Sequence, residues 1–501
     1  CVPWDIFSLD TSQSSDFPGV RPLPFTSKVS DEAREFIQLD VITLGETKQT
    51  VIGGNVNGDL TPYGIQSPFA NRGVQAVLGF EYRRDQLRNR PDLAGQIPLA
   101  AGFGGPIDPV EGKVVVYEFF GEAEVPLIED AFLIEELTAN AAYRFSDYTV
   151  TTGTNNTYTM GTSWQITPDI RARGQFARAV RAPNPIELFT PQSVGLFSLS
   201  RGDNGLFEPC AGDFDPNTPI PEPQRTFEEC ALTGITEAQF GSVQDNPAGQ
   251  FNDLNGGNPD LDPEKANTWT AGVIITPRFA PGLSLTVDWY SIKVKRAISN
   301  IDAGLILNGC LDSGESIFCD LINRGGGGRL FFQDDAFIES TNLNTGVIQT
   351  KGVDVDLNYN FDVEDIGLGD NGAIDFRFIG TWLDKFVNRP LPKAVEAELQ
   401  DVLPPESVKF DCTGFFGSSQ CNRPRPEFSW RVTTTWRTPW DLDVTTTWRY
   451  TDSVSLFGGG PTVSSKLSST SFIDLSFNYQ ILDNVRLRMG VNNIADKDAP
   501  V

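Results

Sequence analysis

Long segments in which apolar and polar residues alternate one by one are the feature that most constrains this fold. Clear examples are residues 137–146 (LTANAAYRFS), 353–360 (VDVDLNYN), 473–479 (IDLSFNY) and 485–491 (VRLRMGV). A period of two is the period of a β-strand, because successive side chains point to opposite faces. We count about fourteen such segments of roughly 10–16 residues, longer than the ~5–6 residues usual in soluble sheets. The sequence therefore predicts an all-β protein with unusually long strands.

The connections between these segments alternate between short turns and long loops. Short turns are predicted at residues 167–168, 276–277, 371–372, 438–439 and 482–483. Long loops are predicted at residues 87–111, 182–266, 298–346, 389–426 and 453–468. Tight turns on one rim and long loops on the other are typical of an antiparallel transmembrane β-barrel, whereas a soluble β-sandwich has no reason to keep that asymmetry. We assign residues 43–501 to the barrel and residues 1–42 to an external loop with one short helix at 30–37.

Composition excludes several classes of function. The formal net charge of -27 repels nucleic acid, so we expect no nucleic-acid partner. The sequence contains no histidine, which removes the commonest general base and the commonest transition-metal ligand. We therefore predict no enzyme, no cofactor and no metal site. No apolar stretch approaches the ~20 residues of a transmembrane helix, but a transmembrane barrel needs only ~10-residue alternating segments.

Six of the seven cysteines fall into three local pairs within Gly-, Pro- and Asp-rich stretches. The spacings predict the disulfides Cys210–Cys230, Cys310–Cys319 and Cys412–Cys421 in an oxidising compartment. Free thiols of a cytosolic protein are the alternative, but buried cysteines would sit among apolar neighbours. Each predicted bridge closes a short loop.

Two segments resemble ligand-binding motifs and are better explained as loops. Residues 367–372 match GxGxxG, but they lie between two alternating strands and end in an Asn-Gly turn, without the helix that a nucleotide site needs. Residues 253–264 have acidic groups near calcium-loop positions, but Asn258 stands where the loop needs glycine. We predict neither site.

Three arginines on one strand are the candidate ligand-binding side chains. Arg171, Arg173 and Arg181 share the polar face that a barrel turns toward its lumen. They have two interpretations: they attract an anionic ligand, or they form ion pairs with carboxylates inside the barrel. We favour the ion pairs because the interior is otherwise rich in Asp and Glu.

Four segments, in order along the chain, resemble the TonB-dependent receptor family. They are residues 116–122 with 125–127 (VYEFFGE and VPL), 164–169 leading into 178–184 (RAVRAPN), 258–264 (NPDLDPE) and 490–497 (GVNNIADK). The resemblance implies a 22-stranded outer-membrane barrel with external loops, of which this chain would supply about fourteen strands. The family's plug domain and last strand are not found, so we expect an open, curved sheet. A further likeness of residues 1–7 to an external-loop segment implies that Cys1 is unpaired here.

The resemblance also implies a function and a location. The family imports scarce nutrients, such as siderophores, cobalamin or oligosaccharides, across the Gram-negative outer membrane. The implied partners are the inner-membrane protein TonB, which acts through the plug, a small-molecule or oligosaccharide ligand, and outer-membrane lipid. Two alternatives remain: a passive outer-membrane porin, and a secreted carbohydrate-binding all-β protein that would be soluble without detergent.

Overall fold

The structure is a computed structural model. It describes residues 38–97, 107–150, 153–212, 222–333, 335–391, 409–417, 421–458 and 465–500. The chain divides into two compact units: one comprises Cys1–Glu46 and Leu87–Glu111, and the other comprises Thr47–Gln86 and Gly112–Val501. The predicted helix at 30–37 and the predicted unpaired Cys1 lie outside the described residues. Among the described residues, no helix is long and apolar enough to cross a bilayer.

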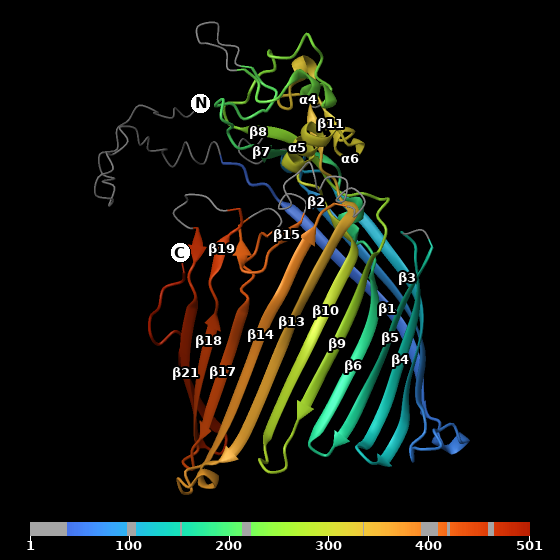
Figure 1. Ribbon diagram of the computed structural model, residues 1–501, viewed down its shortest axis with the longest axis vertical. Coiled ribbons are helices and arrows are strands. Elements are labelled where there is room, and N and C mark those ends of the chain that lie inside the picture. The colour runs from blue at the N-terminus through green and yellow to red at the C-terminus, as the bar shows by residue number, and fades with distance from the viewer. Residues whose placement is uncertain are drawn as a thin grey trace. The chain divides into compact units, whose positions relative to one another are not determined.

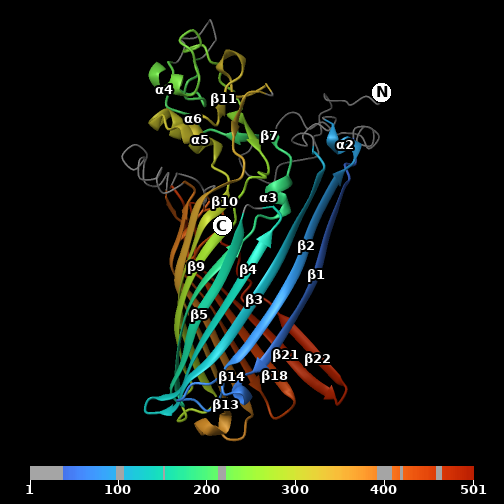
Figure 2. The same cartoon turned by 90° about the vertical axis from the view of Figure 1, so that its right-hand side faces the viewer.

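Fourteen long strands form the continuous path of one antiparallel sheet and follow one another in chain order (Figures 1 and 2). They are β1 (Thr43–Asp59), β2 (Gln75–Pro91), β3 (Val110–Ala131), β4 (Ile134–Tyr148), β5 (Thr154–Thr167), β6 (Ile170–Arg181), β9 (Glu264–Ile275), β10 (Leu283–Ser299), β13 (Leu343–Asp362), β14 (Ala373–Arg389), β17 (Phe428–Arg437), β18 (Leu442–Thr451), β21 (Thr470–Leu482) and β22 (Val485–Val491). A short strand, β15 (Phe410–Asp411), pairs with β14 off this path. The described parts of β1 and β22 do not pair with each other, in agreement with the predicted open sheet.

The register separates an apolar face from a polar face, as the alternation predicts. On the apolar face, Phe176 of β6 is opposite Trp269 of β9, and their ring centroids are 4.5 Å apart. Trp269 is 56% exposed to the surroundings of the chain. Large apolar side chains left exposed along a whole sheet face mark a surface that contacts lipid.

Aromatic side chains lie at both ends of β17 and β18, with Trp430 and Tyr450 stacked at the long-loop end. Trp436 and Trp440 flank the turn between β17 and β18 and contact each other edge to face. Thr438 holds that turn, because its hydroxyl donates a hydrogen bond of 2.8 Å to the carbonyl of Leu442. Such tryptophans are typical of the girdles that meet lipid headgroups.

The GxGxxG segment belongs to the hairpin between β13 and β14. A 3-10 helix, η3 (Val363–Ile366), is followed by Gly367, Gly369 and Gly372, each with a positive φ. The chain then enters β14, so no helix follows the glycines. The segment is a turn, as predicted. A second 3-10 helix, η1 (Thr61–Tyr63), lies between β1 and β2, and a short helix, α2 (Leu93–Gln96), follows β2.

The described residues of the loops predicted at 182–266 and 298–346 fold together into what we call the loop module (the described residues within 185–258 and 300–342). Its four-stranded sheet has the order β11–β12–β8–β7 and takes strands from both loops. Its strands are β7 (Ser193–Ser198), β8 (Gln250–Asn255), β11 (Ile322–Asn323) and β12 (Phe337–Glu339). Its helices are α3 (Pro185–Phe189), α4 (Phe227–Leu232), α5 (Ala303–Ser313), α6 (Ser316–Cys319) and the 3-10 helix η2 (Gly326–Gly328). A smaller three-stranded sheet, β16 (Phe415–Phe416), β19 (Val454–Leu456) and β20 (Lys466–Leu467), joins the last two long loops.

The sequence pattern predicts none of the helices of the loop module. Two of them begin with capping boxes that the sequence shows: Asn184 with Glu187, and Thr226 with Glu229. The longest, α5, begins at the Asp302 cap, and Gly314 ends it in the left-handed conformation. It is stabilised by packing and by a disulfide rather than by a clear helical period, which is why periodicity missed it.

The loop module has its own buried core. Fully buried side chains include Phe251, Ile306 and Phe318, contributed by both loops. The structure forms the disulfides Cys210–Cys230 and Cys310–Cys319 in this core, and Cys412–Cys421 in the loop after β14. These are the pairs that the spacing predicts. A loop-closing bridge stabilises by restricting the unfolded chain, by roughly 2–4 kcal/mol.

One buried ion pair joins the two loops. Arg324 Nη2 donates to Glu208 Oε1 at 2.9 Å, and the two side chains are 3% and 1% exposed. The remaining groups have partners: Arg324 Nε donates to Thr233 Oγ1, and the Cys210 amide donates to Glu208 Oε2, both at 2.8 Å. When the polar groups of a buried ion pair are all hydrogen-bonded in this way, removing only one of the two residues costs much folding free energy.

We predict that Arg324→Met destabilises the loop module by on the order of 3–5 kcal/mol, because it leaves the Glu208 carboxylate buried without a counter-charge. Hydrogen–deuterium exchange of the intact protein in detergent should show faster exchange in β8 and α5, with the long strands unchanged. Arg329→Met, on the same loop, is the matched control. Adding Glu208→Gln should restore part of the protection, and wild-type exchange in Arg324→Met would contradict the prediction.

Candidate functional site

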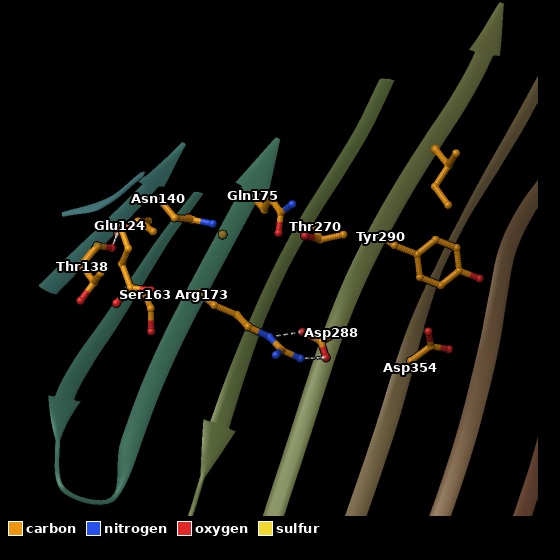
Figure 3. A pocket seen from close by; sticks show the side chains of 13 residues that line it. Glu124, Thr138, Asn140, Ser163, Arg173, Gln175, Thr270, Asp288, Tyr290 and Asp354 are labelled. Atoms are coloured by element: carbon orange, nitrogen blue, oxygen red, sulfur yellow. Dashed lines mark hydrogen bonds and ion pairs between the residues drawn. The ribbon is translucent and has the colours of Figure 1, made fainter. Parts of the chain in front are cut away.

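A pocket of about 650 Å³ lies on the polar face of the sheet, within the second unit (Figure 3). Its lining comes from seven strands, β3 to β6, β9, β10 and β13. The lining residues are Glu124, Thr138, Asn140, Thr162, Ser163, Arg173, Gly174, Gln175, Thr270, Asp288, Tyr290, Ile292 and Asp354. A second pocket of about 690 Å³ shares Glu124 and Asn140 with it. The polar face therefore offers a continuous hydrophilic surface.

Arg173 is the only cation among these lining residues, and it is ion-paired. Its Nε donates to Asp288 Oδ1 at 2.9 Å and its Nη2 to Oδ2 at 2.5 Å, in the two-pronged geometry that suits a guanidinium (Figure 3). The pair spans the intervening strand β9, whose Gly272 is the register partner of both residues. A Cβ at Gly272 would collide with Asp288 Oδ1, so glycine leaves room for this contact.

The other two predicted arginines lie on the same strand with different partners. Arg181 contacts two carboxylates: Glu264 at 2.6 Å and Glu187, of the α3 capping box, at 2.9 Å. Arg171 donates to the amide oxygen of Gln165 at 2.6 Å and has no carboxylate partner among the described residues. The structure thus places the three arginines along β6 without bringing them together in one pocket.

Carboxylates outnumber cations in the pocket. Glu124, Asp288 and Asp354 face one guanidinium, that of Arg173. Such a surface repels an anion and favours a neutral or cationic group. Sequence reasoning missed Glu124, Asp288, Tyr290 and Asp354 as neighbours of Arg173. The alternation of apolar and polar residues predicts which face of the sheet each residue occupies. Only the register of β6, β9 and β10 shows which side chains meet.

The same face carries further ion pairs between adjacent strands. Arg144 of β4 contacts Glu118 of β3 at 2.9 Å, and Ser146 donates to the same carboxylate at 2.6 Å. Others are Arg377–Asp356, Arg437–Asp375 and Arg449–Asp474. In the described residues, no group of three or more His, Cys, Asp or Glu side chains is arranged to hold a metal ion.

The carboxylates of residues 253–264, the segment that resembles a calcium loop, lie in different environments. Asp253 lies in β8, buried inside the loop module, whereas Asp262 and Glu264 are ion-paired to Arg296 and Arg181. The carboxylates therefore do not converge on one point. Burial raises the pKa of Asp253 above its ordinary value of 3.8, and the Asp302 carboxylate adds to the rise, while a hydrogen bond from Asn255 opposes it. Among the described residues, the other side of this carboxylate, its Oδ1, has no hydrogen-bond partner.

The sequence of this chain matches a known protein family, and its fold matches solved structures. The sequence matches the family described as TonB dependent receptor-like, beta-barrel, over residues 6–494. The chain belongs to the TonB-dependent receptor family. Members of this family are proteins of the Gram-negative outer membrane, and so is this receptor.

Solved structures share the fold at low sequence identity. The ferric enterobactin receptor from Pseudomonas aeruginosa, solved as a mutant with enterobactin, is 15% identical, with a TM-score of 0.54 over 90% of this chain and 49% of its own. The siderophore receptor PirA from Acinetobacter baumannii is 13% identical, with a TM-score of 0.51 over 91% of this chain and 51% of its own. The chain thus spans about half the length of these structures. No curated protein matches the sequence.

We predict that Asp253→Asn stabilises the loop module of this receptor at neutral pH. An acid whose folded pKa is raised destabilises the fold once it ionises, so the cost appears as pH rises from 3.8 through the raised folded value and persists above it. The variant should show slower hydrogen exchange in β8 than wild type at pH 7 and no difference near pH 3. Asp320→Asn, at an exposed position of the module, is the control. An equal effect of Asp253→Asn at both pH values would refute the assignment.

Proposed function

We propose that this receptor provides the barrel strands and external loops of a TonB-dependent importer of a scarce nutrient. The family match over residues 6–494 carries the proposal. The fold supports it, since long strands with an apolar outer face cross the membrane and leave a polar inner face along which a ligand can pass. Energy would come from TonB in the inner membrane. The alternative of a secreted carbohydrate-binding all-β protein does not fit the outer-membrane family that the sequence matches.

The ligand we propose to test first is a ferric siderophore, because the solved structures with this fold bear the names of siderophore receptors. Cobalamin and oligosaccharides follow. The excess of carboxylates around Arg173 favours neutral or cationic parts of a ligand on the polar face. We therefore assign the first capture of the ligand to the loop module, whose disulfides and buried Arg324–Glu208 pair hold a fixed surface.

Uptake assays test this proposal directly. Cells that express the full-length receptor should accumulate the correct labelled ligand, and loss of TonB should abolish the accumulation. A passive porin would keep its uptake without TonB, so TonB-independent uptake of every candidate would overturn the proposal. Arg324→Met should lower uptake by raising the half-saturating ligand concentration, because the loop module loses its fixed surface. Lys497→Met, at an exposed position outside the loop module, should leave uptake unchanged.

The orientation of the receptor gives a second test. We expect the loop module outside the cell and the short turns in the periplasm, because long loops of outer-membrane barrels are external. Trypsin added to intact cells should cut after the exposed Arg201 of the loop module and spare Arg278, which lies in the turn between β9 and β10 with its side chain 71% exposed. Permeabilised cells, in which both sites are reachable, serve as control. Cleavage after Arg278 in intact cells would reverse the assigned orientation.

A further inference from the structure

Five cations gather on the apolar face of the sheet, away from the polar lumen face. Cross-strand register places Arg178 of β6, Lys265 of β9, Lys293 and Lys295 of β10, and Lys351 of β13 on the same side as Trp269 and Trp289. We call these five residues the basic patch. The side chains of Lys293 and Lys295 are exposed, and the other three are partly exposed.

Within the part of the chain that the structure describes, the basic patch has no ion-pair partner. None of its five residues forms an ion pair with a described residue, whereas Arg173 and Arg181 on the opposite face of the same sheet do. Several of its register neighbours on this face are neutral: Asn267 is opposite Arg178 and Lys293, and Gln349 is also opposite Lys293. Lys385 of β14 is opposite Lys351 and adds a further cation. Asp384 lies in the bulge of β14 next to Lys385, and we count neither residue in the patch.

Two of these lysines oppose each other directly. Lys265 and Lys295 are register partners in the β9–β10 ladder. Residues that face each other in this way have Cβ atoms only about 4.5–5.5 Å apart, and like charges at that position destabilise a sheet. An anion that bridges the two ammonium groups removes this repulsion. The patch is therefore built for a negatively charged ligand.

The height of the patch identifies the source of that anion. Lys293 lies ten residues beyond Leu283, the start of β10 at the short-turn rim. At ~3.4 Å per residue and a tilt of ~40°, this distance is about 26 Å along the membrane normal, close to the ~25 Å height of the apolar band of outer-membrane barrels. Trp269 and Trp289 lie on the apolar side of the patch, 56% and 43% exposed. The cations thus stand where lipid acyl chains give way to headgroups.

We propose that the basic patch is a binding site for a lipid whose headgroup carries phosphate groups, held with its acyl chains against the tryptophans below. Ammonium and guanidinium groups bind phosphate strongly, and basic residues near a membrane surface attract anionic headgroups. The proposal depends on the membrane location of the receptor and is independent of the imported ligand.

The test measures lipid selectivity of the full-length receptor in detergent by native mass spectrometry. The probes are a bisphosphorylated glycolipid and its dephosphorylated form with the same acyl chains. Wild type should retain the phosphorylated lipid and discriminate against the dephosphorylated one. Lys293→Glu with Lys295→Glu should weaken retention of the phosphorylated lipid by about tenfold or more, since each basic residue contributes a factor of roughly five at a membrane surface.

Matched variants and competitors make the outcome decisive. Lys466→Glu with Lys497→Glu makes the same charge change at exposed positions outside the patch and should leave retention unchanged. Excess inorganic phosphate should not displace the lipid. Equal retention of both lipids, equal loss in both double variants, or displacement by inorganic phosphate would overturn the proposal. If the glutamate variant fails to fold, Lys293→Gln with Lys295→Gln should still lose retention, and wild-type retention there would overturn it as well.

Discussion

The whole structure depends on the pairing of backbone hydrogen bonds along the long strands. In hydrocarbon no water is present to satisfy N–H and C=O groups, so each spanning strand must pair along its length with its neighbours. The antiparallel ladder from β2 to β21 meets this requirement on both sides of every strand. Register then decides the faces, because a shift of one residue would turn Trp289 toward the polar side and Asp288 toward lipid.

The strands could be predicted from sequence because their information is local. In β13, four apolar residues alternate with four polar ones, and the Asn371–Gly372 turn brings β14 back beside it. The loop module could not be predicted in the same way. Its β8 pairs with β12, from a different loop, and α5 is buried in one core with Cys230 and Phe251 of the other loop. These contacts join segments that come close together only after β9 and β10 have paired.

In the candidate site, too, the sequence shows some features, and others depend on how separate strands align. Alternation along β6 placed Arg171 and Arg173 on the polar face, and the acidic composition correctly favoured ion pairing for Arg173. The partner, Asp288, lies two strands away, and the contact needs the missing side chain of Gly272 between them. A single sequence shows each of these residues but not their alignment, since the alignment is a property of three strands together.

The alternation within each strand and the alignment between strands together decide where charged side chains lie. Polar-face arginines contact carboxylates because neighbouring strands bring them within reach, as in Arg144–Glu118 and Arg377–Asp356. The loop module buries Arg324 with Glu208 because its core excludes water. On the apolar face, Lys265 and Lys295 meet each other instead, although the chain has 66 acidic residues against 39 basic ones. An excess of carboxylates leaves these lysines without an ion-pair partner among the described residues, which supports our proposal that the membrane supplies their counter-charge.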